Sequence, residues 1–100
     1  MIWLNGKLLP DSEARVSVYD DALMWGSMVF EMLRTFNQRP FKLKEHLKRL
    51  LASSHMAQID VPYSLADLEQ AYDTLIDANR EMFQSDDEFR TLINVSRGTL

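Results

Sequence analysis

The sequence predicts an α+β domain in which a mostly antiparallel sheet packs against two amphipathic helices. Three observations lead to this fold class. A tight-turn signal joins two short apolar runs near the N-terminus, side chains alternate over 28–36, and two later stretches repeat apolar residues at helical spacing. Because strands and helices mix without regular strand–helix–strand units, we expect one domain over residues 1–100, with a single sheet against two helices.

The first predicted element is a β-hairpin. Asn5 and Gly6 separate the apolar runs 2–4 and 7–9. Both central positions of a type I′ turn need a positive φ angle, which Asn and Gly adopt more readily than other residues. The sequence therefore predicts that these two runs pair as antiparallel strands.

Irregular segments precede the longest predicted strand, which covers 28–36. Residues 10–14 are expected to form a loop and 15–19 a short extended segment, whereas 20–26 is compatible with either a helix or a strand. The alternation over 28–36, with its β-branched and aromatic residues, favours a strand. The turn-forming residues 37–40 then end it.

Two amphipathic helices are predicted after this strand. Over 43–57 the apolar residues keep an i, i+3, i+4 spacing, and Pro62 follows the end of the segment. Ser64 and Asp67 have the spacing of a capping box, which predicts the start of a second helix running over about 65–83.

The remaining predicted elements are an acidic loop at 85–88 and a final strand at 89–95, followed by a turn. The side chains expected in the core are Leu43, Leu47, Leu50, Leu51, Ser54 and Ala57 on the first helix, Leu68, Ala71, Tyr72, Leu75, Ile76 and Met82 on the second, and Met24, Met28 and Met32. Since the sequence stops just after a predicted strand, we expect the chain to be a portion of a longer protein.

Composition disfavours several classes of function. The formal net charge of −4, without a basic stripe, argues against a nucleic-acid partner. Cysteine is absent, and His46 and His55 have no third ligand at metal spacing, so no metal site is expected. No serine lies in the context of a hydrolase nucleophile. Without a secretory signal or a membrane-spanning run, a cytoplasmic location is expected.

Arg49 is the strongest candidate for a binding residue. On a helix, His46 three positions before it and Ser53 four positions after it would lie on the same flank. A guanidinium beside an imidazole and a hydroxyl forms a donor set suited to a phosphate. From spacing alone, a solvated arginine whose stem packs on the helix remains an alternative.

Glu31 and Arg34 are the next candidates, and a strand would direct them to opposite faces. Arg34 would share its face with Phe30 and Met32. A charge on such a face requires a ligand, a paired carboxylate or access to water. A structural ion pair or an exposed arginine at the sheet edge is therefore the alternative to a binding role.

These residues together resemble a known enzyme family. The motif consists of Phe30-Glu31-x-x-Arg34, then Phe41, then His46-Leu47-x-Arg49-Leu50-x-x-Ser53. It is similar to the N-terminal part of the fold-type IV, or class IV, pyridoxal-phosphate enzymes. These are the branched-chain aminotransferases, the D-amino-acid aminotransferases and the aminodeoxychorismate lyases.

The resemblance implies pyridoxal 5′-phosphate as cofactor and a role for seven residues. It assigns Arg49 to the cofactor phosphate, Phe30, Arg34, Trp25 and Arg90 to the substrate pocket, and Glu31 and His46 to the support of these groups. Two departures matter. Phe30 stands where the D-amino-acid enzymes have a tyrosine, and Glu88 stands where some branched-chain enzymes have one.

The resemblance also implies that the catalytic lysine lies elsewhere. Schiff-base chemistry needs a lysine with a reactive amine, but Lys7, Lys42, Lys44 and Lys48 all fall in a turn or on a polar helix face. In the family this lysine belongs to a second, downstream domain. We therefore expect an N-terminal domain of a branched-chain-like aminotransferase that forms a homodimer, binds an amino acid or keto acid, and is inactive as this chain alone.

Two alternatives remain open at this point. One is an aminodeoxychorismate lyase-like enzyme of the same family. The other is a non-catalytic α+β module that associates with itself through apolar surface.

Overall fold

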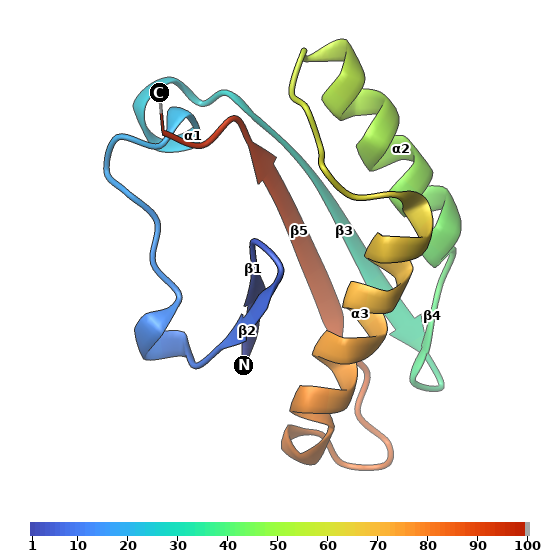
Figure 1. Ribbon diagram of the computed structural model, residues 1–100. Helices are drawn as coiled ribbons and strands as arrows, with labels where there is room; N and C mark the ends of the chain where they lie inside the picture. Colours follow the sequence, from blue (N-terminus) through green and yellow to red (C-terminus); the bar gives the residue numbers. More distant parts are fainter. Residues whose placement is uncertain (100) are drawn as a thin grey trace.

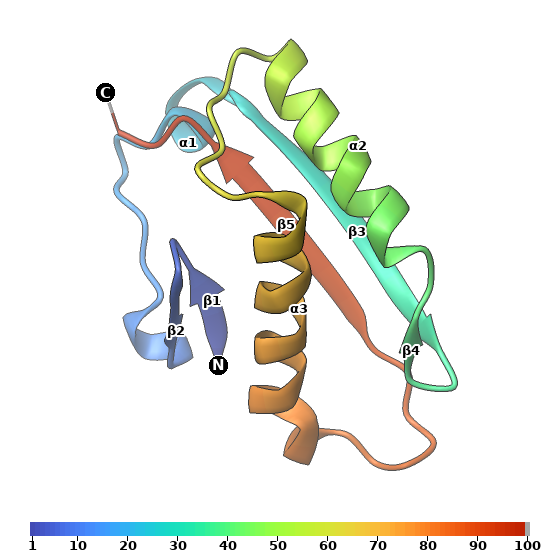
Figure 2. The same ribbon diagram turned by 45° about the vertical axis from the view of Figure 1, so that its right-hand side comes forward.

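The computed structural model describes residues 1–99 and has the α+β architecture that the sequence predicts. Its elements are β1 (Ile2–Leu4), β2 (Lys7–Leu9), η1 (Asp11–Glu13), α1 (Asp21–Trp25), β3 (Met28–Phe36), β4 (Arg39–Pro40), α2 (Leu43–Met56), α3 (Leu65–Asn79), η2 (Arg80–Met82) and β5 (Arg90–Ser96). Helices α2 and α3 lie on one side of β3 and β5, and the β1–β2 hairpin lies near β5 and α3 (Figure 1). The turned view in Figure 2 shows the same arrangement.

The strands form two sheets rather than the single sheet that the sequence predicted. β1 pairs with β2, and a separate three-stranded sheet has the order β4-β3-β5; within residues 1–99 these strand pairings are all antiparallel. The hairpin is attached by side chains instead of a strand ladder. Trp3 and Tyr63 meet edge to face with ring centroids 5.3 Å apart, and the amino group of Met1 donates to Asn79 Oδ1 at 2.9 Å.

The hairpin turn has the predicted type I′ character. Asn5 and Gly6 have φ angles of 50° and 90°. A Cβ atom at Gly6 would lie 3.1 Å from the hydroxyl of Tyr63, so a larger residue there would require this side chain to shift slightly. The positive φ angle of 90° remains the main reason for glycine at this position.

The segment between the hairpin and β3 differs most from the prediction. The expected loop at 10–14 contains the short 3₁₀ helix η1, and within residues 1–99 no strand forms at 15–19. The undecided region 20–26 forms α1. Asp20 caps this helix by accepting the N–H of Ala22 at 2.9 Å, and Gly26 ends it with a left-handed φ of 69°.

The predicted bounds of β3 and the start of α2 are confirmed, and α3 begins with the predicted capping box between Ser64 and Asp67. However, α3 ends at Asn79 instead of continuing to 83. The side chain of Asn79 donates to the carbonyl of Leu75 at 2.8 Å, which competes with the backbone ladder, and the chain tightens into η2. β5 begins at Arg90, one residue later than expected.

The core lies between the helices and the β3–β5 sheet. A cluster of buried side chains joins β3, α3 and the residue before β5, namely Leu33, Tyr72, Ile76 and Phe89. From α2, Leu47 and Leu50 are each 1% exposed. These helical core positions are those that the apolar spacing predicted.

The prediction that methionines fill the core is wrong. Met24, Met28 and Met32 are 47%, 37% and 49% exposed, and Met82 is 75% exposed. Met28 and Met32 lie on the side of β3 that faces away from the buried residues, and Met82 lies in η2, beyond the end of α3. Their regular spacing in the sequence therefore did not indicate burial.

Alternation along β3 and β5 divides the sheet into two surfaces. The covered face, which carries Glu31, Leu33, Thr35 and Thr91, is buried. We call the opposite surface the open face; its exposed residues are Met28, Phe30, Met32, Arg34, Phe36, Arg90, Leu92 and Asn94. Over residues 1–99, no helix combines the length and apolar character needed to cross a membrane.

Candidate functional site

Three of the predicted site residues meet in one polar cluster. Arg49 Nε donates to Glu31 Oε2 at 2.7 Å, and Arg49 Nη2 donates to Glu31 Oε1 at 2.8 Å. His46 Nδ1 lies 2.7 Å from the same Oε1. We call Glu31, His46 and Arg49 the Glu31 cluster.

The cluster forms because α2 packs on the covered face of β3. Glu31 is directed toward this face by strand alternation and is 5% exposed. His46 and Arg49 are three residues apart on α2, so both reach the carboxylate from the same flank of the helix. The side chain of His46 is 21% exposed, whereas that of Arg49 is 69% exposed.

The electrostatics of the cluster favour the ionised carboxylate. The hydrogen bond from Arg49 is the main cause that lowers the pKa of Glu31; burial acts in the opposite direction, and the contact with His46 lowers the pKa further. The same bond to Glu31 raises the pKa of Arg49. A buried negative charge is therefore compensated by a partner that stays protonated.

Arg49 keeps unused hydrogen-bonding capacity. A guanidinium has five N–H bonds, and two of them point to Glu31. Both N–H bonds of Nη1 and one of Nη2 are not used in this pair. Because the side chain is largely exposed, these donors are accessible to an anion. The imidazole expected beside them is directed to Glu31 through Nδ1.

The predicted substrate residues lie on a different surface. Phe30, Arg34 and Arg90 belong to the open face, where Arg34 stands directly opposite Arg90 across the strands. Phe30 is 60% exposed. Trp25, on α1, is 74% exposed and is not a core residue. The structure therefore brings the Glu31 cluster together but separates it from the open face by the thickness of the sheet.

Arg34 is held less firmly than Arg49. Its Nε donates to the carbonyl of Thr35 at 2.9 Å, and its guanidinium carbon lies 4.0 Å from the ring centroid of Phe36. Its Nη2 is 4.0 Å from Glu88 Oε2, which is an ion pair but not a hydrogen bond. The sequence left open whether Arg34 is exposed, paired or ligand-binding, and the structure shows an exposed arginine with a loosely placed carboxylate.

Glu88 has a structural task that the sequence did not reveal. Its carboxylate accepts the hydroxyl of Thr35 at 2.9 Å and the backbone N–H groups of Asn37 and Gln38 at 2.7 Å each. These bonds lower its pKa, chiefly the one from Gln38. The only available signal was an acidic residue in a loop, and its partners lie about 50 positions earlier in the chain, beyond any local pattern.

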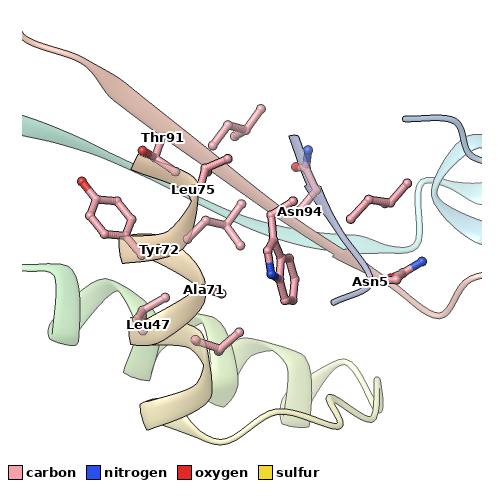
Figure 3. Close-up of a pocket in the computed structure, with 12 residues that line it drawn as sticks. Asn5, Leu47, Ala71, Tyr72, Leu75, Thr91 and Asn94 are labelled. Carbon is pink, nitrogen blue, oxygen red and sulfur yellow. The ribbon is translucent and has the colours of Figure 1, made fainter. Parts of the chain in front are cut away.

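The hollow beside the hairpin is not a phosphate site. It has a volume of about 150 Å³ and lies between the hairpin, α3 and β5 (Figure 3). Its lining includes Asn5, Leu75 and Asn94 and contains no Lys, Arg, His, Asp or Glu. Arg49 lines neither this hollow nor the second one, which lies beside η2. Its unused N–H groups are instead on the exposed surface of α2.

Comparison with known proteins gives consistent results. A family model described as amino-transferase class IV matches residues 28–100. A probable branched-chain-amino-acid aminotransferase of Rickettsia typhi is 40% identical over 78 residues, which is 78% of this chain and 27% of that protein. A D-alanine aminotransferase of Staphylococcus aureus is 34% identical over 79 residues, covering 79% of this chain and 28% of that protein.

A solved structure shows the same arrangement of elements. It is a branched-chain amino acid aminotransferase from T.th. in complex with N-(5′-phosphopyridoxyl)-L-glutamate, and it superimposes with a TM-score of 0.82 at 30% identity. The match covers 96% of this chain and 32% of the other. The chain thus spans between about a quarter and a third of the length of the proteins that it matches.

Proposed function

Because this chain belongs to the amino-transferase class IV family, we propose that it forms the N-terminal domain of a pyridoxal-phosphate-dependent aminotransferase. The proposed reaction moves an amino group between an amino acid and a 2-keto acid, with a branched-chain-like substrate. The names of similar proteins support this class of reaction. The observation that carries the proposal is the exposed, partly unused guanidinium of Arg49, held by Glu31 at the position where the family motif requires a phosphate ligand.

We assign the phosphate of the cofactor to Arg49. Its free N–H groups offer charge-assisted hydrogen bonds, and the bond to Glu31 keeps the guanidinium in one orientation. When bound, pyridoxal 5′-phosphate supplies the carbonyl group and the electron-withdrawing ring that amino-group transfer needs. The contribution of this chain is then to bind and orient the cofactor.

We assign substrate contacts to the open face. Phe30, Met32 and Leu92 present apolar surface, and Arg34 and Arg90 present two cations at one end of it. This combination suits a substrate that has a carboxylate and an apolar side chain. Trp25 is assigned to the rim of this surface, because its large exposed ring lies on α1, just before β3.

We place the catalytic lysine in another domain. All four lysines of the chain, Lys7, Lys42, Lys44 and Lys48, are exposed, so none has the desolvated environment that activates a Schiff-base lysine. In this proposal the chain works with a lysine-bearing domain inside a homodimer in the cytoplasm. The chain alone is expected to convert no amino acid to a keto acid when supplied with pyridoxal 5′-phosphate.

The binding role is tested by NMR titration of the 100-residue chain. Pyridoxamine 5′-phosphate is the probe, because it has no aldehyde that could react with exposed lysines, and pyridoxamine is the matched ligand without phosphate. We expect the phosphorylated compound to shift the Arg49 side-chain signals and pyridoxamine to leave them unchanged. Arg49→Gln should abolish the response, whereas Arg39→Gln, the same change on exposed β4, should retain it.

Two results count against the proposal. If Arg49→Gln binds the phosphorylated compound as tightly as the original chain, Arg49 is not the phosphate ligand. If the isolated chain itself converts amino acids to keto acids with the cofactor, the assignment of the lysine to another domain is wrong.

A further inference from the structure

We propose that Glu31 is a positioning residue that presents Arg49 to the ligand phosphate, and that His46 in turn fixes Glu31. This inference rests on the proposed function, because it concerns how the phosphate ligand is oriented. It extends that function by assigning roles to Glu31 and His46, which would orient Arg49 without contacting the ligand themselves.

The geometry of the pair determines which edge of the guanidinium is free. Glu31 receives Nε and Nη2, which form one edge of the planar group. The edge formed by Nη1 and Nη2 then remains for a bidentate contact with a phosphate. Two parallel bonds fix the plane of Arg49 as well as its position, which a single contact could not do.

Glu31 is a suitable anchor because its own position is fixed by the sheet. It lies within β3, is 5% exposed and is paired across the strands with Ile93 of β5. Arg49 is at the other extreme, with a side chain that is 69% exposed on α2. Glu31 on the strand therefore restrains the exposed side chain of Arg49 on the helix, and the arginine loses rotamer freedom before any ligand binds.

His46 restrains the carboxylate from the second direction. Its Nδ1 lies 2.7 Å from Glu31 Oε1, the oxygen that also accepts Arg49 Nη2. A neutral imidazole with its proton on Nδ1 is sufficient as donor, so the role does not require a charged histidine. With both oxygens engaged, the carboxylate cannot rotate away from Arg49.

The test uses Glu31→Asp, because this variant keeps the charge but shortens the side chain by one methylene. The shorter side chain cannot keep both bonds from its place in β3, so any change reflects position rather than charge. The effect on Arg49 is measured through the exchange rate of its Nε proton by NMR, without ligand. The effect on binding is measured through the dissociation constant for pyridoxamine 5′-phosphate.

We expect Glu31→Asp to speed exchange of the Arg49 Nε proton and to weaken binding by about 2- to 12-fold, the range expected when one long side chain must be ordered on binding. Glu81→Asp, the same chemical change on exposed η2, is the control and should change neither quantity. Glu45 lies four residues before Arg49 and could replace the lost partner, so Glu31→Asp is also tested with Glu45→Gln.

His46 is tested with two variants that differ in one property. His46→Asn keeps a side-chain N–H donor near the place of Nδ1, whereas His46→Leu keeps only bulk. We expect His46→Asn to bind close to the original affinity and His46→Leu to resemble Glu31→Asp. A role in packing alone would lower stability without this selective rescue of Arg49 exchange and of affinity.

The outcomes separate this inference from the proposed function. If the original chain binds and the Glu31→Asp and His46→Leu variants bind equally well, or if Arg49 exchange is unchanged in both, the positioning role is wrong and the proposed function stands. If the original chain shows no phosphate-dependent binding, the proposed function fails and this inference fails with it. Should Glu31→Asp not fold, His46→Leu provides the same measurement.

Discussion

On the covered face of the sheet Leu33 is 3% exposed, whereas its neighbour Met32 on the open face is 49% exposed. The two arginines differ in a parallel way. Arg49, which reaches the covered side from α2, is held by two bonds of 2.7 and 2.8 Å to one carboxylate, whereas on the open face Arg34 is 4.0 Å from its carboxylate. The covered face of β3 therefore contributes to the stability of the fold, whereas the open face leaves apolar and cationic side chains accessible to a ligand.

The largest difference between the faces should appear when one apolar side chain is truncated on each. Leu33→Ala removes a buried group from the core cluster and should lower the free energy of unfolding by about 2–5 kcal/mol. Met32→Ala removes an exposed group and should change it by less than about 0.5 kcal/mol. Urea unfolding followed by circular dichroism measures both, and equal losses would contradict the division into two faces.

The buried charge on the covered face gives the next largest effect. Glu31→Gln leaves Arg49 and His46 without their ionised partner and should cost about 1–3 kcal/mol of unfolding free energy. Glu81→Gln makes the same change in charge on exposed η2 and serves as the control. If both variants have the same urea midpoint, the Glu31 cluster does not contribute to stability.

The pH dependence of stability sharpens the same comparison. The folded-state pKa of Glu31 lies below its ordinary value of 4.5, so the unfolded chain binds more protons between the two values. The contribution of this carboxylate is therefore complete above its unfolded pKa and is lost as the pH falls through the lowered one. Glu88, near the open face, also has a lowered pKa. Its contribution to the free energy of unfolding is therefore lost in the same acid range.

Variants separate these two carboxyls. Urea midpoints measured from about pH 6 to about pH 3 should fall less steeply for Glu31→Gln than for the original chain. Glu88→Gln should flatten the acid limb by a smaller amount, because the side chain of Glu88 is 33% exposed and its bonds are better screened by water. An unchanged acid limb in Glu31→Gln is the result that would count against a depressed pKa.

Local patterns allowed most of the regular structure to be predicted. The turn at Asn5 and Gly6, the alternation in β3 and the capping box at Ser64 each depend on residues close in sequence, and all three are confirmed. Alternation also predicted correctly that Glu31 and Arg34 lie on opposite faces. The end of α3 was predicted at about residue 83, but the helix ends at Asn79, where the side chain bonds the carbonyl of Leu75 and the chain changes to η2.

Long-range contacts could not be predicted in the same way. No local pattern indicated that Glu88 accepts hydrogen bonds from the turn after β3, about 50 residues earlier in the chain. Met28 and Met32 were expected in the core, but both are exposed. A spacing of four residues places side chains on one face of either a strand or a helix, and it does not show which face another element covers. The family motif implied only a supporting role for Glu31 and His46, and the contact of both Arg49 and His46 with Glu31 became visible only once α2 was seen to pack on β3.

The smallest effect concerns the cations of the open face. Arg34 and Arg90 are directly opposite each other in the register, where like charges destabilise a sheet. Arg90→Gln should therefore raise the free energy of unfolding by about 0.2–1 kcal/mol at low salt, and the gain should shrink as salt screens the repulsion. Arg39→Gln, whose cross-strand partner is Phe36, removes a charge without relieving this pair and is the control. If Arg90→Gln is more stable but the complete enzyme binds substrate more weakly, the two arginines are retained for ligand binding at a cost in stability. A loss of stability would mean that the two arginines are already compensated within the sheet.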